Sequence, residues 1–307
     1  MAEKIERKLF LTGASGLLGR SIHRTFKEAG WTVFGVSLSR TGPELQKLDL
    51  TDFGAVSAAI IKFKPTLIIH SAAQRFPDKV SADPEGARRI NVDATFHLAE
   101  TADKYDIPLL YISTDYVFDG RNPPYKVEDK PNPLNDYGKL KLEGEEIVKA
   151  ANKENIILRV PVLYGPVEKL SESAVTCLLE PLLNVAKPTK VSDYEKRCPS
   201  HVDDIAEICL NMAVFRFDHN DLDISGVFQW CGSETLTKFQ MVQIMGEVFS
   251  LPHAHLSKTP DSSNGNTQSV NRPYDTQMDR SRLESKGIGK HTVFASGIRS
   301  ALAAWVS

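Results

Sequence analysis

Residues 8–19 read Lys8-Leu9-Phe10-Leu11-Thr12-Gly13-Ala14-Ser15-Gly16-Leu17-Leu18-Gly19, an apolar run that leads directly into glycines at a G-x-x-G-x-x-G spacing. The near-continuous apolar run is typical of a strand that is buried on both faces. Glycines allow a tight turn and a close approach of the backbone to a pyrophosphate, and the helix that follows offers amide donors. We therefore predict a dinucleotide-binding loop formed by Gly13, Ser15, Gly16, Leu17, Leu18 and Gly19.

Further apolar runs and amphipathic stretches extend this pattern along the first half of the chain. The runs cover 32–36, 66–70, 109–113 and 156–160, and the helical stretches cover 17–29, 53–63, 84–104 and 136–152. Strands that alternate with helices form a parallel sheet. We predict an α/β fold, a doubly wound parallel sheet of the Rossmann kind in residues 1–165. A smaller C-terminal α+β substrate lobe is expected in 166–307, with some chain returning to the core.

The pattern is looser in the second half. It predicts helices near 171–185 and 202–215, a strand at 227–230 and a helix that begins at Thr237. The polar stretch 257–272 is rich in turn-forming residues and is expected to be a loop.

Composition limits the classes of function. Of 307 residues, 37 are basic and 39 are acidic, and no concentrated basic field suggests a nucleic-acid partner. The four cysteines lack C-x-x-C spacing, and His253 and His255 lack a third ligand, so no metal site is predicted. No apolar run is long enough to cross a membrane, and the charged N-terminus does not resemble a signal peptide. We expect a cytoplasmic protein without membrane contact.

The end of the second predicted strand indicates which dinucleotide binds. An NAD site usually places an acidic residue there, whereas this chain ends the strand with Ser39 and Arg40. A guanidinium can hold a phosphate with two hydrogen bonds, so NADP (NADPH when reduced) is favoured. The alternative is that Arg40 is a solvated loop residue. Two further segments are assigned to the cofactor: Asp49 and Leu50 beside the adenine, and the small residues Ser71, Ala72 and Ala73, which let the backbone pass close.

Tyr137 and Lys141 are the candidate catalytic pair. They are four residues apart and therefore share one face of the predicted helix 136–152. A strand upstream ends with Ser113 and Thr114, whose hydroxyl could polarise a carbonyl while a tyrosine moves the proton. The lysine ammonium favours the phenolate and can bond the nicotinamide ribose. The alternative is a packed tyrosine beside a surface lysine.

These residues resemble the motifs of the extended short-chain dehydrogenases/reductases, in the branch that contains dTDP-4-dehydrorhamnose reductase. The resemblance is carried by the glycine loop 13–19, by 113–120 (Ser-Thr-Asp-Tyr-Val-Phe-Asp-Gly) and by Tyr137 with Lys141. It implies that Thr114, Tyr137 and Lys141 form a catalytic triad. It also implies that Asn91 organises the proton relay beside the cofactor.

A second resemblance covers nearly the whole chain, to the regulatory β subunits of methionine adenosyltransferase. It is carried by 122–125, 163–176, 199–202, Arg272-Pro273 and 283–289. That family keeps the reductase fold, binds NADP and acts by binding the catalytic adenosyltransferase. Its C-terminal tail docks into the partner, whereas this sequence ends at Ser307, so we expect any partner contacts to come from the folded body.

Two hypotheses therefore stay open. One is an NADP-binding regulatory subunit whose partner is the methionine adenosyltransferase catalytic subunit. The other is an active NADPH-dependent reductase of a nucleotide-linked 4-keto sugar, in which Tyr137 protonates the carbonyl oxygen.

Overall fold

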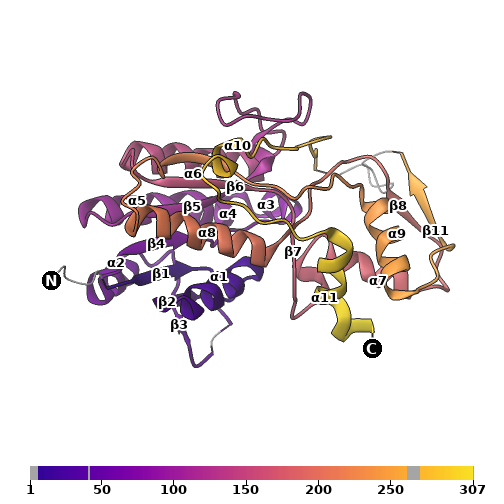
Figure 1. Cartoon of the computed structure of the whole chain (residues 1–307), viewed down its shortest axis with the longest axis horizontal. Helices are drawn as coiled ribbons and strands as arrows, with labels where there is room; N and C mark the ends of the chain where they lie inside the picture. Colours follow the sequence, from indigo (N-terminus) through magenta and orange to yellow (C-terminus); the bar gives the residue numbers. More distant parts are fainter. Residues whose placement is uncertain (1–5, 41, 261–269, 307) are drawn as a thin grey trace. The chain divides into compact units, whose positions relative to one another are not determined.

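A computed structural model describes residues 6–40, 42–260 and 270–306 (Figure 1). The chain forms two compact units that are interleaved in sequence. The first comprises Met1–Thr114, Asp136–Arg159 and Ala206–Phe228, and the second comprises Asp115–Asn135, Val160–Ile205 and Gln229–Ser307. The predicted division at residue 165 stays a prediction, because a compact unit need not be a domain that folds independently.

The first unit is built on a seven-stranded sheet with the order β10-β6-β5-β4-β1-β2-β3. The strands are β1 (Lys8–Thr12), β2 (Thr32–Ser37), β3 (Leu45–Lys47), β4 (Leu67–His70), β5 (Leu109–Thr114), β6 (Ile156–Val160) and β10 (Gly226–Gln229). β1 pairs in parallel with β2 on one side and with β4 on the other, so that Phe10 lies between Phe34 and Ile68. The order reverses between β1 and β4, and such a switch point places a crevice at the carboxyl ends of the two strands.

Helices cover both faces of this sheet (Figure 1). The main ones are α1 (Leu17–Glu28), α2 (Phe53–Phe63), α5 (Ala94–Lys104), α6 (Asp136–Ala151) and α8 (Val202–Phe217). The buried side chains Ile60, Leu98 and Val148 of α2, α5 and α6 share one core with the sheet. On the other face, Trp31 after α1 packs edge-on against Phe217 of α8. The fold is therefore the doubly wound α/β sheet that the sequence predicts.

Some elements of the first unit differ from the sequence prediction. The short strand β3 and the helix α3 (Pro77–Ala82) are not predicted. The helix expected over 84–104 is divided into α4 (Pro84–Arg88), a π-helical turn η1 (Arg89–Asp93) and α5. Its start is as predicted, because Asp83 accepts a hydrogen bond from the amide of Gly86 at 3.0 Å.

The second unit contains short paired strands and a helical core. Its elements are β7 (Leu163–Tyr164), β8 (Thr189–Ser192), β9 (Ser200–His201), β11 (Leu256–Thr259), α7 (Leu179–Leu183), α9 (Lys238–Phe249), α10 (Ser281–Glu284) and α11 (Phe294–Val306). β7 pairs with β9 and β8 with β11, both in parallel. Thr237 begins α9 with reciprocal bonds to Gln240 at 3.2 and 2.8 Å, a capping box that explains the predicted start.

Two predictions in this unit are wrong in part. The helix expected near 171–185 is only α7 and two short 3-10 turns, Leu170–Glu172 and Thr176–Leu178. β11 occupies the start of the expected loop 257–272, and residues 261–269 of that loop lie outside the described residues.

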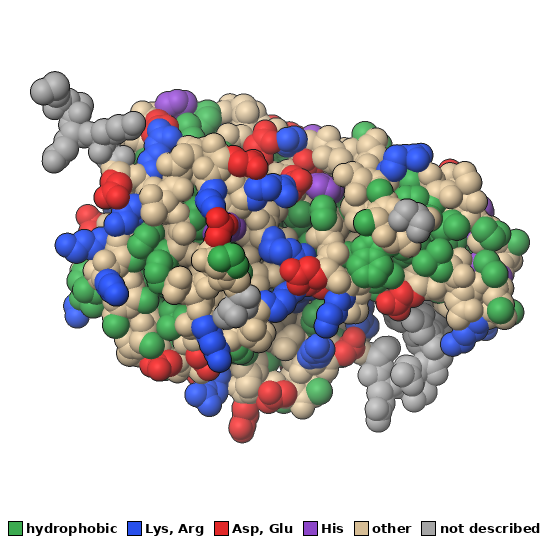
Figure 2. All heavy atoms as spheres, turned by 90° about the horizontal axis from the view of Figure 1, so that it is seen from below, with side chains coloured by type: hydrophobic (Ala, Val, Ile, Leu, Met, Phe, Trp, Pro, Cys, Tyr) green, Lys and Arg blue, Asp and Glu red, His purple; other side chains and the backbone are tan. Residues whose placement is uncertain are grey.

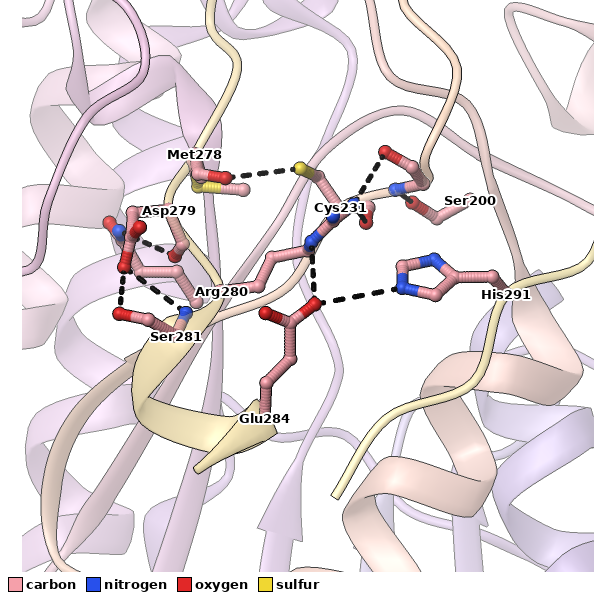
Figure 3. A network of polar contacts seen from close by, with 10 residues as sticks. Ser200, Cys231, Met278, Asp279, Arg280, Ser281, Glu284 and His291 are labelled. Carbon is pink, nitrogen blue, oxygen red and sulfur yellow. Dashed lines mark hydrogen bonds and ion pairs between the residues drawn. The ribbon is translucent and has the colours of Figure 1, made fainter. Parts of the chain in front are cut away.

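A polar network holds the segment 278–291 against the chain that follows β10 (Figure 3). The Cys231 thiol donates to the carbonyl of Met278 at 3.3 Å, and Arg280 Nη1 donates to the carbonyl of Cys231 at 3.3 Å. Glu284 pairs with Arg280 at 3.2 Å and lies 3.9 Å from His291. Cys231 is thus a buried hydrogen-bond donor in this unit.

The surface mixes both signs of charge. Figure 2 shows lysine and arginine side chains interspersed with aspartate and glutamate on the face that it displays. In the first unit several of the exposed charges are paired, among them Arg7 with Asp218 at 2.6 Å and Lys149 with Glu146 at 3.3 Å. Such exposed pairs contribute little to stability.

Candidate functional site

The glycine loop between β1 and α1 needs its glycines for steric reasons. Gly13 has a φ of +68°, and a Cβ there would lie 2.8 Å from the backbone nitrogen of Ala72. A Cβ on Gly19 would lie 2.0 Å from the carbonyl oxygen of Gly13, to which the amide of Gly16 donates at 2.8 Å. The loop therefore folds back on itself and packs directly on the chain that leaves β4.

The N-terminus of α1 supplies the amides that an anion needs. Gly16 is the N-cap and has no side chain to bond these amides, and the first turn holds no acidic residue. Leu17 and Leu18 bury their side chains in the core, and Arg20 Nη1 donates to the carbonyl of Ser15 at 2.8 Å. A loop whose helix amides have no side-chain cap and no acidic neighbour in the first turn suits a pyrophosphate in charge.

A buried chain of hydrogen bonds joins the ends of β1 and β4. The Thr12 hydroxyl accepts from the amides of Ser71 and Ala72 at 3.1 and 3.2 Å, so its own proton points to Nδ1 of His70, 2.7 Å away. His70 is therefore the tautomer with the proton on Nε2, which donates to Thr95 Oγ1 at 3.0 Å. The half-buried Ala73 follows Ala72 along the same edge.

The chain continues to Asn91 in the π-helical turn η1. Thr95 donates to the carbonyl of Asn91 at 2.9 Å. The Asn91 side chain accepts from the amide of Gln74 at 2.8 Å and donates to its carbonyl at 3.0 Å. Burial, assisted by the Lys141 ammonium, lowers the pKa of His70 to about 3, so the imidazole at the centre of the chain is neutral. The structure thus links Asn91 to the glycine loop through His70.

Tyr137 and Lys141 lie one turn apart at the start of α6. Lys141 is buried, and its Nζ lies 3.8 Å from the centre of the Tyr111 ring in β5. Burial lowers the pKa of Lys141 to about 7, whereas the charge of Glu145 acts in the opposite direction. α6 packs on β5, with Gly144 close to Tyr111, and Thr114 ends the same strand, 6% exposed. These elements bring the lysine to the strand that carries Thr114.

A buried ion pair next to this lysine is absent from the sequence prediction. Arg159 in β6 donates to the Glu145 carboxylate through Nε at 2.9 Å and Nη2 at 2.7 Å. Ser113 donates to the same carboxylate at 2.6 Å. The i,i+4 spacing of Lys141 and Glu145 indicates that a carboxylate lies near the lysine. In a sequence, however, the same spacing is typical of an exposed ion pair.

The residues assigned to the adenosine end fall into two groups. Ser39 and Arg40 follow β2 and are exposed, and the Ser37 hydroxyl bonds to the carbonyl of Arg40. Asp49 bonds the amide and hydroxyl of Thr51, each at 2.8 Å, which lowers the pKa of its carboxyl. Leu50 packs on the sheet core. The described contacts of Asp49 and Leu50 are therefore with their own loop and with the core.

Thr114, Tyr137 and Lys141 are residue types that can carry acid–base chemistry at a carbonyl oxygen. A tyrosine beside a buried ammonium can give a proton to an oxygen, and a threonine hydroxyl can bond the same oxygen. Among the described residues, no three His, Cys, Asp or Glu side chains are arranged to hold a metal ion. No helix in the described part of the chain is both long and apolar enough to span a membrane.

Comparison with known proteins assigns the family. The family described as RmlD substrate binding domain matches residues 7–306. Methionine adenosyltransferase 2 subunit beta of Xenopus tropicalis is 46% identical over 96% of this chain and 87% of its own length, and that of Bos taurus is 43% identical over the same shares.

A solved structure agrees with this assignment. A hypothetical dTDP-4-dehydrorhamnose reductase from Sulfolobus tokodaii is 30% identical, with a TM-score of 0.81 over 95% of this chain and 98% of that one. The chain belongs to the RmlD substrate binding domain family and, within it, to the family of methionine adenosyltransferase 2 beta subunits.

Proposed function

We propose that the chain is an NADP-binding regulatory subunit that associates with a methionine adenosyltransferase catalytic subunit. The observation that carries the proposal is the likeness, along almost the whole chain, to proteins named as beta subunits of that enzyme. A protein whose relatives are named as subunits is expected to work in an assembly. The location that this implies is the cytoplasm.

The residues of the first unit fit the dinucleotide. The open amides of α1 and the glycine loop suit the pyrophosphate, and Gly13 lets the loop pack on the Ala72 backbone, with which a Cβ would collide. Ser39 and the exposed Arg40 would hold the 2′-phosphate, since a guanidinium bonds phosphate in a bidentate manner. Lys141 would bond the nicotinamide ribose, and Asn91, Asp49, Leu50 and Ser71 to Ala73 would border the cofactor.

The arrangement of Thr114, Tyr137 and Lys141 supports a second candidate function, reduction of a nucleotide-linked 4-keto sugar. NADPH, when bound, supplies a hydride to the carbonyl carbon. Tyr137 gives its hydroxyl proton to the carbonyl oxygen, which becomes an alcohol, and Thr114 bonds that oxygen. The Lys141 ammonium stabilises the phenolate that Tyr137 becomes when it has given up its proton.

A cluster of cations in the second unit would suit the anionic part of such a substrate. Lys238 is half-buried, and this burial lowers the pKa of its ammonium. Arg272 and Arg197 lower that pKa further, whereas Glu195 raises it. Asp115 acts on Arg197 as well, so three cations face two carboxylates, which leaves one positive charge that a diphosphate could neutralise.

One pair of experiments tests the proposal. The full chain, loaded with NADP, is used to capture the purified catalytic adenosyltransferase subunit of the same organism, and NADPH oxidation is followed with dTDP-4-dehydrorhamnose. Capture without oxidation would support the regulatory subunit. Oxidation without capture would reject it in favour of the reductase.

A further inference from the structure

The three candidate catalytic side chains stand on two different elements. Thr114 ends β5, whereas Tyr137 and Lys141 occupy the first turns of α6. Their mutual position therefore depends on how α6 is placed on β5. Preorganised groups must be held to within fractions of an ångström to act together.

Adjacent residues of α6 fix this placement. A Cβ on Gly144 would lie 2.2 Å from the Tyr111 hydroxyl, so helix and strand are in close contact there. Glu145, the next residue, accepts a hydrogen bond from Ser113 at 2.6 Å. Ser113 immediately precedes Thr114, and Glu145 lies one turn after Lys141. The bond thus joins the neighbours of the candidate catalytic residues.

Glu145 is also tied to the next strand. Its carboxylate receives two hydrogen bonds from Arg159 of β6, at 2.9 and 2.7 Å, and both side chains are buried, at 0% and 1% exposure. Charge-assisted bonds are strong where water is excluded. Glu145 lies four residues after Lys141 on α6, so the pair holds this carboxylate on the face of the helix that carries the lysine.

Several charged or titratable groups face the Lys141 ammonium. They are His70 from β4, Tyr111 from β5, and Tyr137 and Glu145 from α6. Arg159 from β6 and Lys149 from α6 act through Glu145, with which both form ion pairs. His70 is neutral, and burial raises the pKa of Tyr111 well above its usual value, so neither carries charge near neutral pH. Glu145 is the carboxylate of this set, and it favours the protonated lysine.

We propose that Glu145, held by Ser113 and Arg159, is a positioning residue that fixes α6 on β5 and places a negative charge beside Lys141 where the nicotinamide ribose would bind. The inference rests on the proposed function, since it assigns Lys141 to the cofactor. It differs from a purely structural ion pair, which would stabilise the fold without influencing the lysine.

The test is the pH dependence of NADPH affinity, measured by calorimetry on the full chain. Binding that needs the ammonium is strongest below the pKa of about 7 of the cofactor-free lysine and weakens as the pH rises through it. Glu145→Gln removes the negative charge and keeps the shape. We expect it to move the midpoint of this decline downward by about one pH unit.

Glu146→Gln is the matched control. Glu146 is the next residue of the same helix, and its side chain is 66% exposed. It pairs with Lys149 at 3.3 Å, and Lys149 also lies 3.8 Å from Glu145, so each variant removes one partner of that lysine. We expect its pH profile to coincide with that of the unmodified chain. The phosphate of NADPH itself titrates in the same way with both variants. The difference between their pH profiles therefore reports on the protein alone.

Glu145→Asp is the second variant, for use if E145Q does not fold. It retains a carboxylate for Arg159, but its shorter side chain would lose the hydrogen bond from Ser113. We expect E145D to keep the midpoint and to weaken NADPH binding by about fivefold, the loss of one hydrogen bond. The inference would be overturned if E145D bound NADPH with the affinity and pH profile of the unmodified chain. It would also be overturned if folded E145Q kept the pH profile of the unmodified chain. Either result would leave the proposed function intact. No NADPH binding by the unmodified chain at any pH would overturn the proposed function together with the inference.

Discussion

We propose that single side chains decide whether the site prefers NADP or NAD. No acidic residue stands between positions 36 and 40, and Arg40 is exposed after β2. A bidentate, charge-assisted contact contributes about 1.5–3 kcal/mol, so Arg40→Ala should weaken NADP binding by roughly tenfold or more. NAD binding should change little. Calorimetry that gives equal affinities for NADP and NAD in the unmodified chain would reject this assignment.

Tyr137 is the residue on which the reductase hypothesis depends. Tyr137→Phe removes the acidic hydroxyl and keeps the ring, so NADPH affinity should hardly change. A positioned proton donor contributes about 10²–10⁴-fold, and any turnover of a 4-keto sugar should fall by that factor. Steady-state NADPH oxidation measures it. Turnover that survives the substitution would show that another group donates the proton.

His70 links protonation to stability. Its pKa is about 3 in the folded chain against 6.5 for an ordinary histidine, so the unfolded chain binds more protons between these values. Stability from this residue is therefore complete above pH 6.5 and is lost as the pH falls toward 3, by at most about 1.4 kcal/mol per pH unit.

His70→Gln isolates this contribution. The amide keeps an acceptor for Thr12 and a donor for Thr95 but cannot be protonated. Urea unfolding between about pH 7 and pH 5 should show the unmodified chain losing stability faster than the variant, because carboxylates titrate equally in both. Parallel curves would mean that His70 is not the group that titrates.

At the scale of elements, the β1–α1 loop has no room for a Cβ at Gly13 or Gly19. A Cβ on Gly19 would lie 2.0 Å from the Gly13 carbonyl, a backbone atom that cannot move cheaply, whereas a Cβ on Gly42 would meet nothing within 4 Å. Overpacking costs about 1–3 kcal/mol, so Gly19→Ala should lower the melting temperature and weaken NADPH binding more than tenfold. Gly42→Ala is the control and should behave as the unmodified chain in both measurements.

The elements also show what the sequence can and cannot predict. The glycine loop and the strands β1, β2, β4, β5 and β6 follow from local apolar runs. The division of the helix 84–104 does not, because the π-helical turn coincides with the bonds between Asn91 and Gln74, residues 17 positions apart. β3 is a three-residue edge strand with two exposed side chains, too short for a periodic signal.

The candidate site likewise contains residues that the sequence predicts and residues that it does not. Tyr137 and Lys141 are visible from their spacing, since both lie on one helix. Glu145, Ser113 and Arg159 converge only when α6, β5 and β6 pack together, and no sequence spacing encodes that. Charged residues in a sequence look solvated by default, so a buried carboxylate is the feature that sequence reasoning misses most easily.

At the scale of the whole molecule, the open question is which surface would hold a catalytic partner. Near the end of the chain, Ala301 and Leu302 of α11 belong to the core of the second unit, whereas 303–305 are exposed. A truncation that begins at residue 301 would remove a buried leucine and cost about 2–5 kcal/mol, so lost binding could reflect unfolding.

Deletion of 303–307 is the sharper experiment, because Phe294, Ile298 and Leu302 keep their places in the core. If the folded body carries the docking surface, this chain should capture the catalytic adenosyltransferase subunit as well as the full chain does. Its melting temperature should fall by no more than a few degrees, because 303–305 are exposed and Val306 is only partly buried against the core. The deletion of 301–307 serves as the comparison, and its melting temperature should fall further. Loss of capture in the shorter deletion, with unchanged melting temperature and NADP affinity, would place the docking element in the last turn of α11 instead.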